Sequence, residues 1–154
     1  MASPNTTFTS GAVLTAAQMN NLPFGLMGTP KRITAAQNTI TTVVDITNAT
    51  LAFTGIANRW YKATYSANGT VTTGGSTFRF LLTDSSNTTV VGGIFDHQFI
   101  GTYSDTVNVI FYFQATGSVT RKVRALLQAG GGSMSLYGDA TIPATFIIED
   151  IGSV

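Results

Sequence analysis

The sequence contains no cysteine and only one histidine, and 10% of its 154 residues are charged. Without cysteine there is no disulfide framework and no thiolate metal site, so packing and hydrogen bonds have to hold the fold. A formal net charge of +1 gives no electrostatic basis for binding nucleic acid. Globular proteins usually carry about a quarter charged residues, and a surface this low in charge has little protection against association. Such a surface suits a protein that works in an assembly.

Long apolar runs are also absent. No stretch approaches the roughly 18 consecutive apolar residues of a membrane-spanning helix. The first ten residues, MASPNTTFTS, lack the basic-then-apolar order of a secretory signal. We therefore expect neither membrane insertion nor a secretory signal.

The most apolar stretch runs from Thr106 to Ala129 and alternates with the period of a β-strand on both sides of Gly117. This pattern predicts a β-hairpin. A three-residue loop, Ala115–Gly117, would pair Phe113 with Val119 and keep apolar residues opposite one another. The pattern also predicts a buried core that contains Phe78, Phe80, Val109, Phe111, Phe113 and Val123.

The second face of this hairpin is less polar than a solvent-exposed face should be, because Ile110, Tyr112 and Leu126 share it with Lys122 and Arg124. Two interpretations remain open. The strands are central in their sheet and covered within one chain, or they are covered by another subunit. The second interpretation predicts a homotrimer, because a closed symmetric interface can bury such groups.

The other segments with strand character are short and are separated by turn residues about every 8–12 residues. Turns are expected at Asn68–Gly69 and Asp84–Asn87, and a bulge or bend at Gly92–Gly93. This arrangement predicts an all-β sandwich or barrel. The expected strands are Ile40–Ile46, Leu51–Phe53, Trp60–Ala67, Thr77–Thr83, Val90–Ile100, Met134–Tyr137 and Thr145–Ile151.

Before the β region the sequence predicts a short helical arm. Thr15 and Gln18 have the spacing of a capping box, and Pro23 ends the helix. About two turns, Ala16–Leu22, are too short to be stable alone. The apolar side chains of the arm must therefore dock, either on the chain's own β-domain or on a neighbouring protein that the arm anchors. These anchoring candidates are Leu14, Met19, Leu22 and Phe24.

A segment with two glycines and a proline, Gly25–Pro30, is expected to link this arm to the rest of the chain. The predicted division is an arm with its helix and linker at residues 1–30 and one β-sandwich domain at residues 31–154.

No pattern in the sequence points to catalysis. His97 follows Asp96, but a catalytic pair also needs a nucleophile and an orienting geometry, so we expect an exposed or hydrogen-bonded histidine. The acidic residues show no calcium-loop spacing, and Gly130–Gly132 lacks the following lysine of a phosphate-binding loop. We expect no enzyme activity and no catalytic, cofactor or metal site.

Two further groups of residues have possible binding roles. The basic cluster Arg121, Lys122 and Arg124 is expected to face solvent or to pair with carboxylates across subunits. Aromatic side chains could stack against sugar rings, although aromatic residues in β-sandwiches more often belong to the core or to an interface. These aromatic residues are Trp60, Tyr61, Tyr65, Tyr103, Tyr112 and Tyr137.

Three segments together resemble known families. The opening FTSGAVLTAAQMNNLPFG resembles the N-terminal segment of many tailed-bacteriophage virion proteins. The middle segment TGIANRWYKATYSANGTV is similar to the early core strand of the C1q/TNF-like jelly roll, in which a glycine precedes aromatic-rich alternation. The closing segment YGDATIPATFIIEDIGSV resembles the C-terminal strand of phage tail and fibre proteins that end in Glu-Asp-Ile-Gly.

This resemblance implies a jelly-roll β-sandwich that assembles as a homotrimer on a phage particle. Minor tail proteins, head fibres and capsid decoration proteins all use such domains. The implied function is that of a structural protein at the tail or capsid surface, assembled in the host cytoplasm and in contact with other virion proteins. The alternative is a carbohydrate-binding adhesion module on the same particle, whose partner would be a host surface glycan.

Overall fold

The structure, a computed structural model, describes residues 22–153, and these residues form strands and loops without a helix. No helix long and apolar enough to cross a membrane occurs among them. The strands are β1 (Gly25–Leu26), β2 (Lys31–Ile33), β3 (Gln37–Ile40), β4 (Val44–Gly55), β5 (Arg59–Val71), β6 (Thr77–Thr83), β7 (Val90–Gln98), β8 (Asp105–Gln114), β9 (Gly117–Ala129), β10 (Met134–Tyr137) and β11 (Ala144–Ser153).

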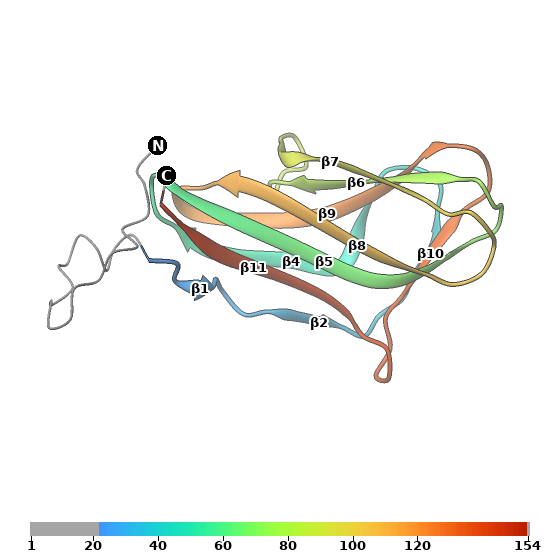
Figure 1. Cartoon of the computed structure of the whole chain (residues 1–154), viewed down its shortest axis with the longest axis horizontal. Helices are drawn as coiled ribbons and strands as arrows, with labels where there is room; N and C mark the ends of the chain where they lie inside the picture. Colours follow the sequence, from blue (N-terminus) through green and yellow to red (C-terminus); the bar gives the residue numbers. More distant parts are fainter. Residues whose placement is uncertain (1–21, 154) are drawn as a thin grey trace, which may run out of the picture.

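The strands form two antiparallel sheets that pack face to face (Figure 1). Sheet A is built around β5, which pairs with β8 on one side and with β11 and β10 on the other. The short strands β1 and β2 add to β11, and β3 adds to β10. Sheet B has the order β4-β9-β6-β7. The two four-strand sets β2-β11-β5-β8 and β4-β9-β6-β7 form a jelly roll, so the expected all-β jelly-roll sandwich is confirmed for the described residues.

The core lies between the sheets because the strands alternate apolar and polar residues. In β5, Tyr61, Ala63 and Tyr65 are fully buried, whereas Trp60 on the opposite face is exposed. Aromatic rings fill one end of the core. The ring centre of Tyr61 lies 5.0 Å from that of Phe53 and 5.8 Å from that of Phe113. The predicted core residues are all buried: Phe78, Phe80, Val109, Phe111, Phe113 and Val123.

The predicted hairpin between Thr106 and Ala129 is wrong. β8 pairs with β5 in sheet A, and β9 pairs with β4 and β6 in sheet B, so the chain crosses from one sheet to the other between them. Phe113 lies opposite Tyr61, and Val119 lies opposite Phe53. Alternation correctly identified which residues of the two strands face inward. These residues face each other from opposite sheets, however, and are not cross-strand pairs within one sheet.

Two other predicted boundaries also change. The segment expected as one strand at Ile40–Ile46 is divided, because Ile40 ends β3 and Val44–Ile46 begin β4, and Leu51–Phe53 belongs to the same long strand β4 rather than to a separate one. Asn68–Gly69 is not a turn, because both residues belong to β5 and pair with β8 and β10. A Cβ atom on Gly69 would lie 3.1 Å from the ring of Phe99, so this glycine allows close packing over the strand.

The remaining predicted strands are present, although β5 and β11 extend beyond Trp60–Ala67 and Thr145–Ile151, and the strand expected at Val90–Ile100 ends at Gln98. Thr77–Thr83 and Met134–Tyr137 are strands with those bounds, and Asp84–Asn87 forms a turn. The register of β6 and β7 shifts where Gly92–Gly93 lies, as expected for a bulge.

The predicted helix Ala16–Leu22, with the anchoring candidates Leu14 and Met19, lies outside the described residues apart from Leu22. The segment expected as a linker is partly built into the domain. Gly25–Leu26 forms β1 and pairs with β11, and the backbone N–H of Met27 donates to the carbonyl of Ile148 at 2.8 Å. Residues 25–27 are therefore attached to sheet A.

Candidate interaction surfaces

The outer face of sheet A carries several exposed apolar side chains. Strand register places these side chains in rows across β1, β11, β5 and β8. Thr64 lies between Ile147 and Ile110, and Lys62 lies between Glu149 and Tyr112. Tyr112 is 52% exposed and Ile110 is 41% exposed. The outer face of sheet A includes Leu26, Trp60, Lys62, Thr64, Ile110, Tyr112, Ile147 and Glu149, together with the polar residues Arg32, Ser66, Asn108, Gln114 and Thr145.

The two charges at the centre of this face, on Lys62 and Glu149, cancel. Lys62 Nζ lies 2.8 Å from Glu149 Oε2, and the hydrogen bond that Lys62 donates to this carboxylate raises the pKa of Lys62. The hydroxyl oxygen of Thr64 is buried and has no hydrogen-bond partner. A neutral, partly aromatic surface with an unpartnered hydroxyl is suited to being covered, because exposed apolar area favours association.

The structure separates the three hairpin residues predicted to form an interface. Ile110 and Tyr112 lie together on the outer face of sheet A. Leu126 belongs to β9 and lies in sheet B, where it is half-buried and paired with Arg79. These residues therefore do not share one surface, because the hairpin that would have joined them does not form.

The two described arm residues, Leu22 and Phe24, lie at one end of sheet A and contact Arg59. The guanidinium of Arg59 lies 4.2 Å from the centre of the Phe24 ring and donates a hydrogen bond to the carbonyl of Leu22. Arg59 also donates two hydrogen bonds, of 2.6 and 2.7 Å, to the carboxylate of Asp150. These contacts attach the first described residues of the chain to this end of the domain.

The Arg59–Asp150 pair is buried, and it is held by more than charge attraction. Burial alone would raise the pKa of Asp150, but hydrogen bonds from Arg59 and from the backbone of Gly152 and Phe24 keep that pKa below its ordinary value. Sequence analysis missed this pair, because an arginine on the aromatic β5 strand and an aspartate near the C-terminus give no local signal of contact.

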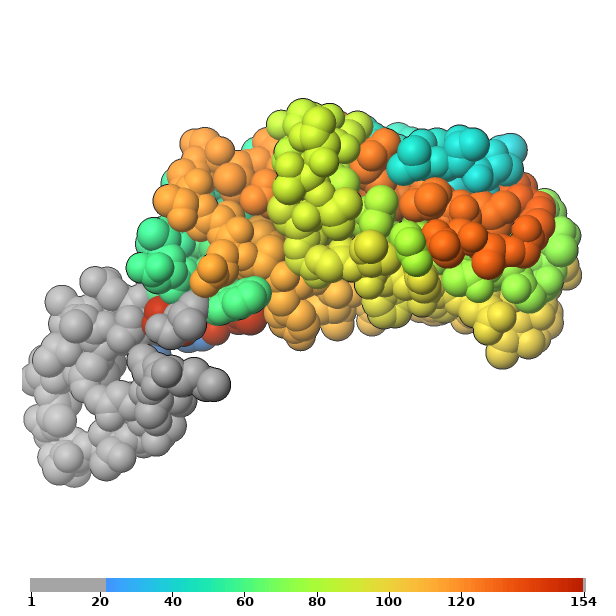
Figure 2. All heavy atoms as spheres, turned by 90° about the horizontal axis from the view of Figure 1, so that it is seen from above, coloured from blue at the N-terminus to red at the C-terminus, as the bar shows by residue number. Residues whose placement is uncertain are grey.

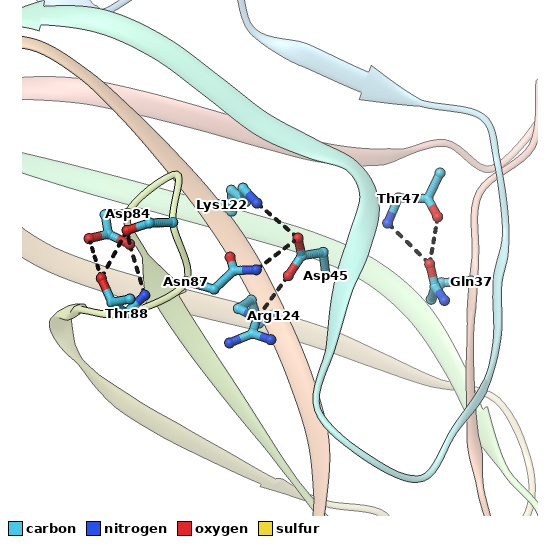
Figure 3. Close-up of polar contacts among 9 residues, drawn as sticks. Gln37, Asp45, Thr47, Asp84, Asn87, Thr88, Lys122 and Arg124 are labelled. Carbon is cyan, nitrogen blue, oxygen red and sulfur yellow. Dashed lines mark hydrogen bonds and ion pairs between the residues drawn. The ribbon is translucent and has the colours of Figure 1, made fainter.

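The basic cluster does not act as a unit. Lys122 and Arg124 pair with Asp45 of the same chain at 2.9 and 2.8 Å, and Asn87 donates to the same carboxylate (Figure 3). These hydrogen bonds, that from Lys122 first, lower the pKa of Asp45. The expected pairing across subunits is therefore replaced by pairing within the chain.

Arg121 faces inward instead. Its guanidinium lies 5.2 Å from the ring centre of Phe113, its Nε atom has no partner, and burial lowers its pKa. Arg121 is a buried cation rather than part of a surface cluster.

A shallow hollow of about 610 Å³ lies where β2 passes β4. Its lining contains two cations and no carboxylate, which suits a polar or anionic small molecule better than a metal ion. The lining residues are Lys31, Arg32, Thr34, Asn48, Thr50, Ala52 and Thr120.

His97 is hydrogen-bonded, as one of the sequence expectations had it. Its Nε2 atom lies 3.1 Å from Asp105 Oδ2, and its ring packs 4.7 Å from that of Phe99. Asp96, its neighbour in sequence, pairs instead with Arg79 at 2.8 Å. Within residues 22–153, no three His, Asp or Glu side chains form a group that could hold a metal ion.

No protein-family model and no curated protein matches the sequence. Among solved structures, the chain is similar to a family two carbohydrate esterase from Cellvibrio japonicus, with 12% identity and a TM-score of 0.35. The match covers 82% of this chain but 35% of the esterase chain. It is also similar to the carbohydrate-binding module CBM36 in complex with calcium and xylotriose, with 15% identity, 79% and 97% coverage and a TM-score of 0.34. Likenesses this distant carry no argument about function.

Proposed function

We propose that the chain is a non-enzymatic structural protein that assembles as a homotrimer through the outer face of sheet A. The observation that carries this proposal is the set of exposed apolar side chains on that face, with Ile110 and Tyr112 on β8 and Trp60 on the neighbouring strand β5. Three copies around an axis bury such a face in a closed interface without leaving a free edge for further growth.

Charge supports self-association of this face. Lys62 is neutralised by Glu149 within the same copy, so identical faces meet without repulsion between unpaired charges. The partnerless hydroxyl of Thr64 gains a possible partner when another copy covers it.

We further propose that the trimer is a component of a bacteriophage virion, at the tail or capsid surface, where residues 1–21 contact other virion proteins. The resemblance of the opening and closing segments to phage proteins supports this role. Labelling the protein on purified particles and imaging them tests it. Label at the tail or capsid surface is the expected result, and particles without label contradict the proposal.

A pair of variants tests the trimer. Ile110→Lys places a charge in the centre of the proposed interface, whereas Ile94→Lys places one on β7 of sheet B, where Ile94 is already 56% exposed. Sedimentation of the wild type and of Ile94→Lys at micromolar concentration should show three chains, and Ile110→Lys should sediment as a monomer. A wild-type monomer, or an Ile110→Lys trimer, would refute the interface.

Carbohydrate binding is a second candidate function because aromatic rings are exposed on two separate surfaces. Trp60 and Tyr112 lie on the outer face of sheet A, and Tyr103 lies in the loop between β7 and β8, where it is 70% exposed. A trimer would cover the first surface and leave the loop free. Glycan binding is therefore compatible with the structural role.

A further inference from the structure

Three loops meet at the end of the sandwich farthest from β1 and from the carboxyl end of β11 (Figures 1 and 2). They are residues 72–76, 99–104 and 130–133, which we call the distal loops. None of them contains a charged residue, and glycine, serine and threonine dominate them. Loops of this composition offer hydrogen-bonding groups with little electrostatic bias.

Ser76 connects the three distal loops by hydrogen bonds. Its buried hydroxyl lies 2.8 Å from the carbonyl oxygen of Thr73 and 2.6 Å from that of Gly131. Its carbonyl accepts from the N–H of Phe99 at 2.9 Å, and the carbonyl of Phe99 accepts from the N–H of Gly75 at 2.8 Å. Phe99 is buried against Phe78, so the loop between β7 and β8 is anchored in the core where it begins.

Two large side chains leave this fixed body and contribute little to the core. Ile100 is 84% exposed and Tyr103 is 70% exposed. The ring of Tyr103 rests on the backbone of Gly101, because a Cβ atom there would overlap the ring. The Cδ1–Cε1–Cζ side of the ring is thus held against the protein, and most of the side chain is open to solvent. The aromatic ring is pre-oriented, which lowers the entropic cost of binding.

We propose that the distal loops bind a neutral saccharide, with Tyr103 as the stacking platform. The C–H groups on one face of a pyranose ring are attracted to the negative π face of an aromatic ring. Thr73, Thr102 and Ser104 supply hydroxyl groups in the same loops, and these loops contain no charge that would favour an acidic sugar. This inference rests on the second proposed function, glycan binding, and does not depend on the trimer.

A saccharide fits this surface better than a protein partner does. A specific protein interface buries about 800 Å² on each partner, and two exposed large side chains above neutral loops provide far less apolar area. One sugar ring needs only a single aromatic platform and a few hydrogen-bonding groups.

The test uses saturation-transfer NMR on the full chain with a panel of neutral and acidic oligosaccharides, followed by titration of those that bind. At least one neutral oligosaccharide should bind. Tyr103→Ala should weaken its affinity about tenfold or more, and Tyr103→Phe should retain it. Gly101→Ala keeps the ring but displaces it, and should also weaken binding. Tyr137→Ala, which removes an exposed ring hydrogen-bonded to Thr70, is the matched control and should bind like the wild type.

Three outcomes would overturn the proposal. They are no binding by any saccharide of the panel, equal affinity of Tyr103→Ala and the wild type, and binding of acidic sugars alone. Thermal midpoints of the variants establish that each is folded. Binding of monovalent sugars to the Ile110→Lys variant separates the two proposals, because the distal loops lie within one chain and should bind whether or not the trimer forms.

Discussion

Residues 59 and 150 are separated by most of the sandwich domain in sequence, yet their side chains form a buried, bidentate ion pair. Removing one partner leaves a buried charge without compensation, so Asp150→Asn should lower the free energy of unfolding by about 3–5 kcal/mol. The matched control is Glu149→Gln, one position along, which breaks the partly exposed pair with Lys62 and should cost far less, because solvent screens such a pair. Urea denaturation measures both, and equal losses would show that the burial of Asp150 has no energetic consequence.

The same pair gives a pH dependence. The pKa of Asp150 in the folded chain lies below its ordinary value of 3.8, so the folded state holds the proton less tightly than the unfolded chain. The stabilisation is complete above that ordinary value and is lost as pH falls through the lower, folded pKa. The thermal midpoint of the wild type should decrease as the pH is lowered below about 4. This decrease should be less steep in Asp150→Asn. Parallel curves for the two proteins would contradict this assignment.

At the scale of elements, the sequence predicted which residues face inward but not which strands pair. Alternation in Thr77–Thr83 gave a strand with correct bounds because its inward phenylalanines and outward Arg79 are unambiguous. In Thr145–Ile151 both faces are apolar, so Ile147 could not be assigned to the outer face from its neighbours alone. The two strands flanking Gly117 showed matching alternation because both face one core from opposite sheets, and period alone cannot separate that arrangement from a hairpin.

The bulge in β7 provides a prediction at the same scale. Gly92 and Gly93 both have positive φ angles, 73° and 95°, so alanine at either position should cost about 1–2 kcal/mol. A Cβ atom on Gly92 would also lie 3.0 Å from Phe111 Cβ and from the Tyr112 carbonyl oxygen of β8, whereas Gly93 faces open space. Gly92→Ala should therefore cost about 1–3 kcal/mol more than Gly93→Ala in chemical denaturation. Equal costs would mean that β7 does not approach β8 closely at the bulge.

The whole molecule combines an end that holds the N-terminal segment with an opposite end that carries the distal loops (Figure 1). The all-β jelly roll followed from alternation and turn spacing together with the family resemblance. The attachment of residues 22–27 to the domain could not be predicted from the sequence, because Gly25–Pro30 has the composition of a linker. The attachment depends on residues far along the sequence. β1 pairs with β11, and the Phe24 ring contacts the guanidinium of Arg59.

This attachment fixes where the N-terminal arm can be cut to test its anchoring role. Deleting residues 1–21 leaves β1, Phe24 and the Arg59–Asp150 pair in place, so the thermal midpoint and the β circular-dichroism spectrum should match the full chain. Deleting residues 1–28 also removes β1 and the partly buried Met27, and should lower the thermal midpoint. If residues 1–21 anchor the protein, the shorter deletion should keep the fold and abolish incorporation into particles. A shorter deletion that unfolds the domain would place the arm in the core, and one that still joins particles would end the anchor proposal.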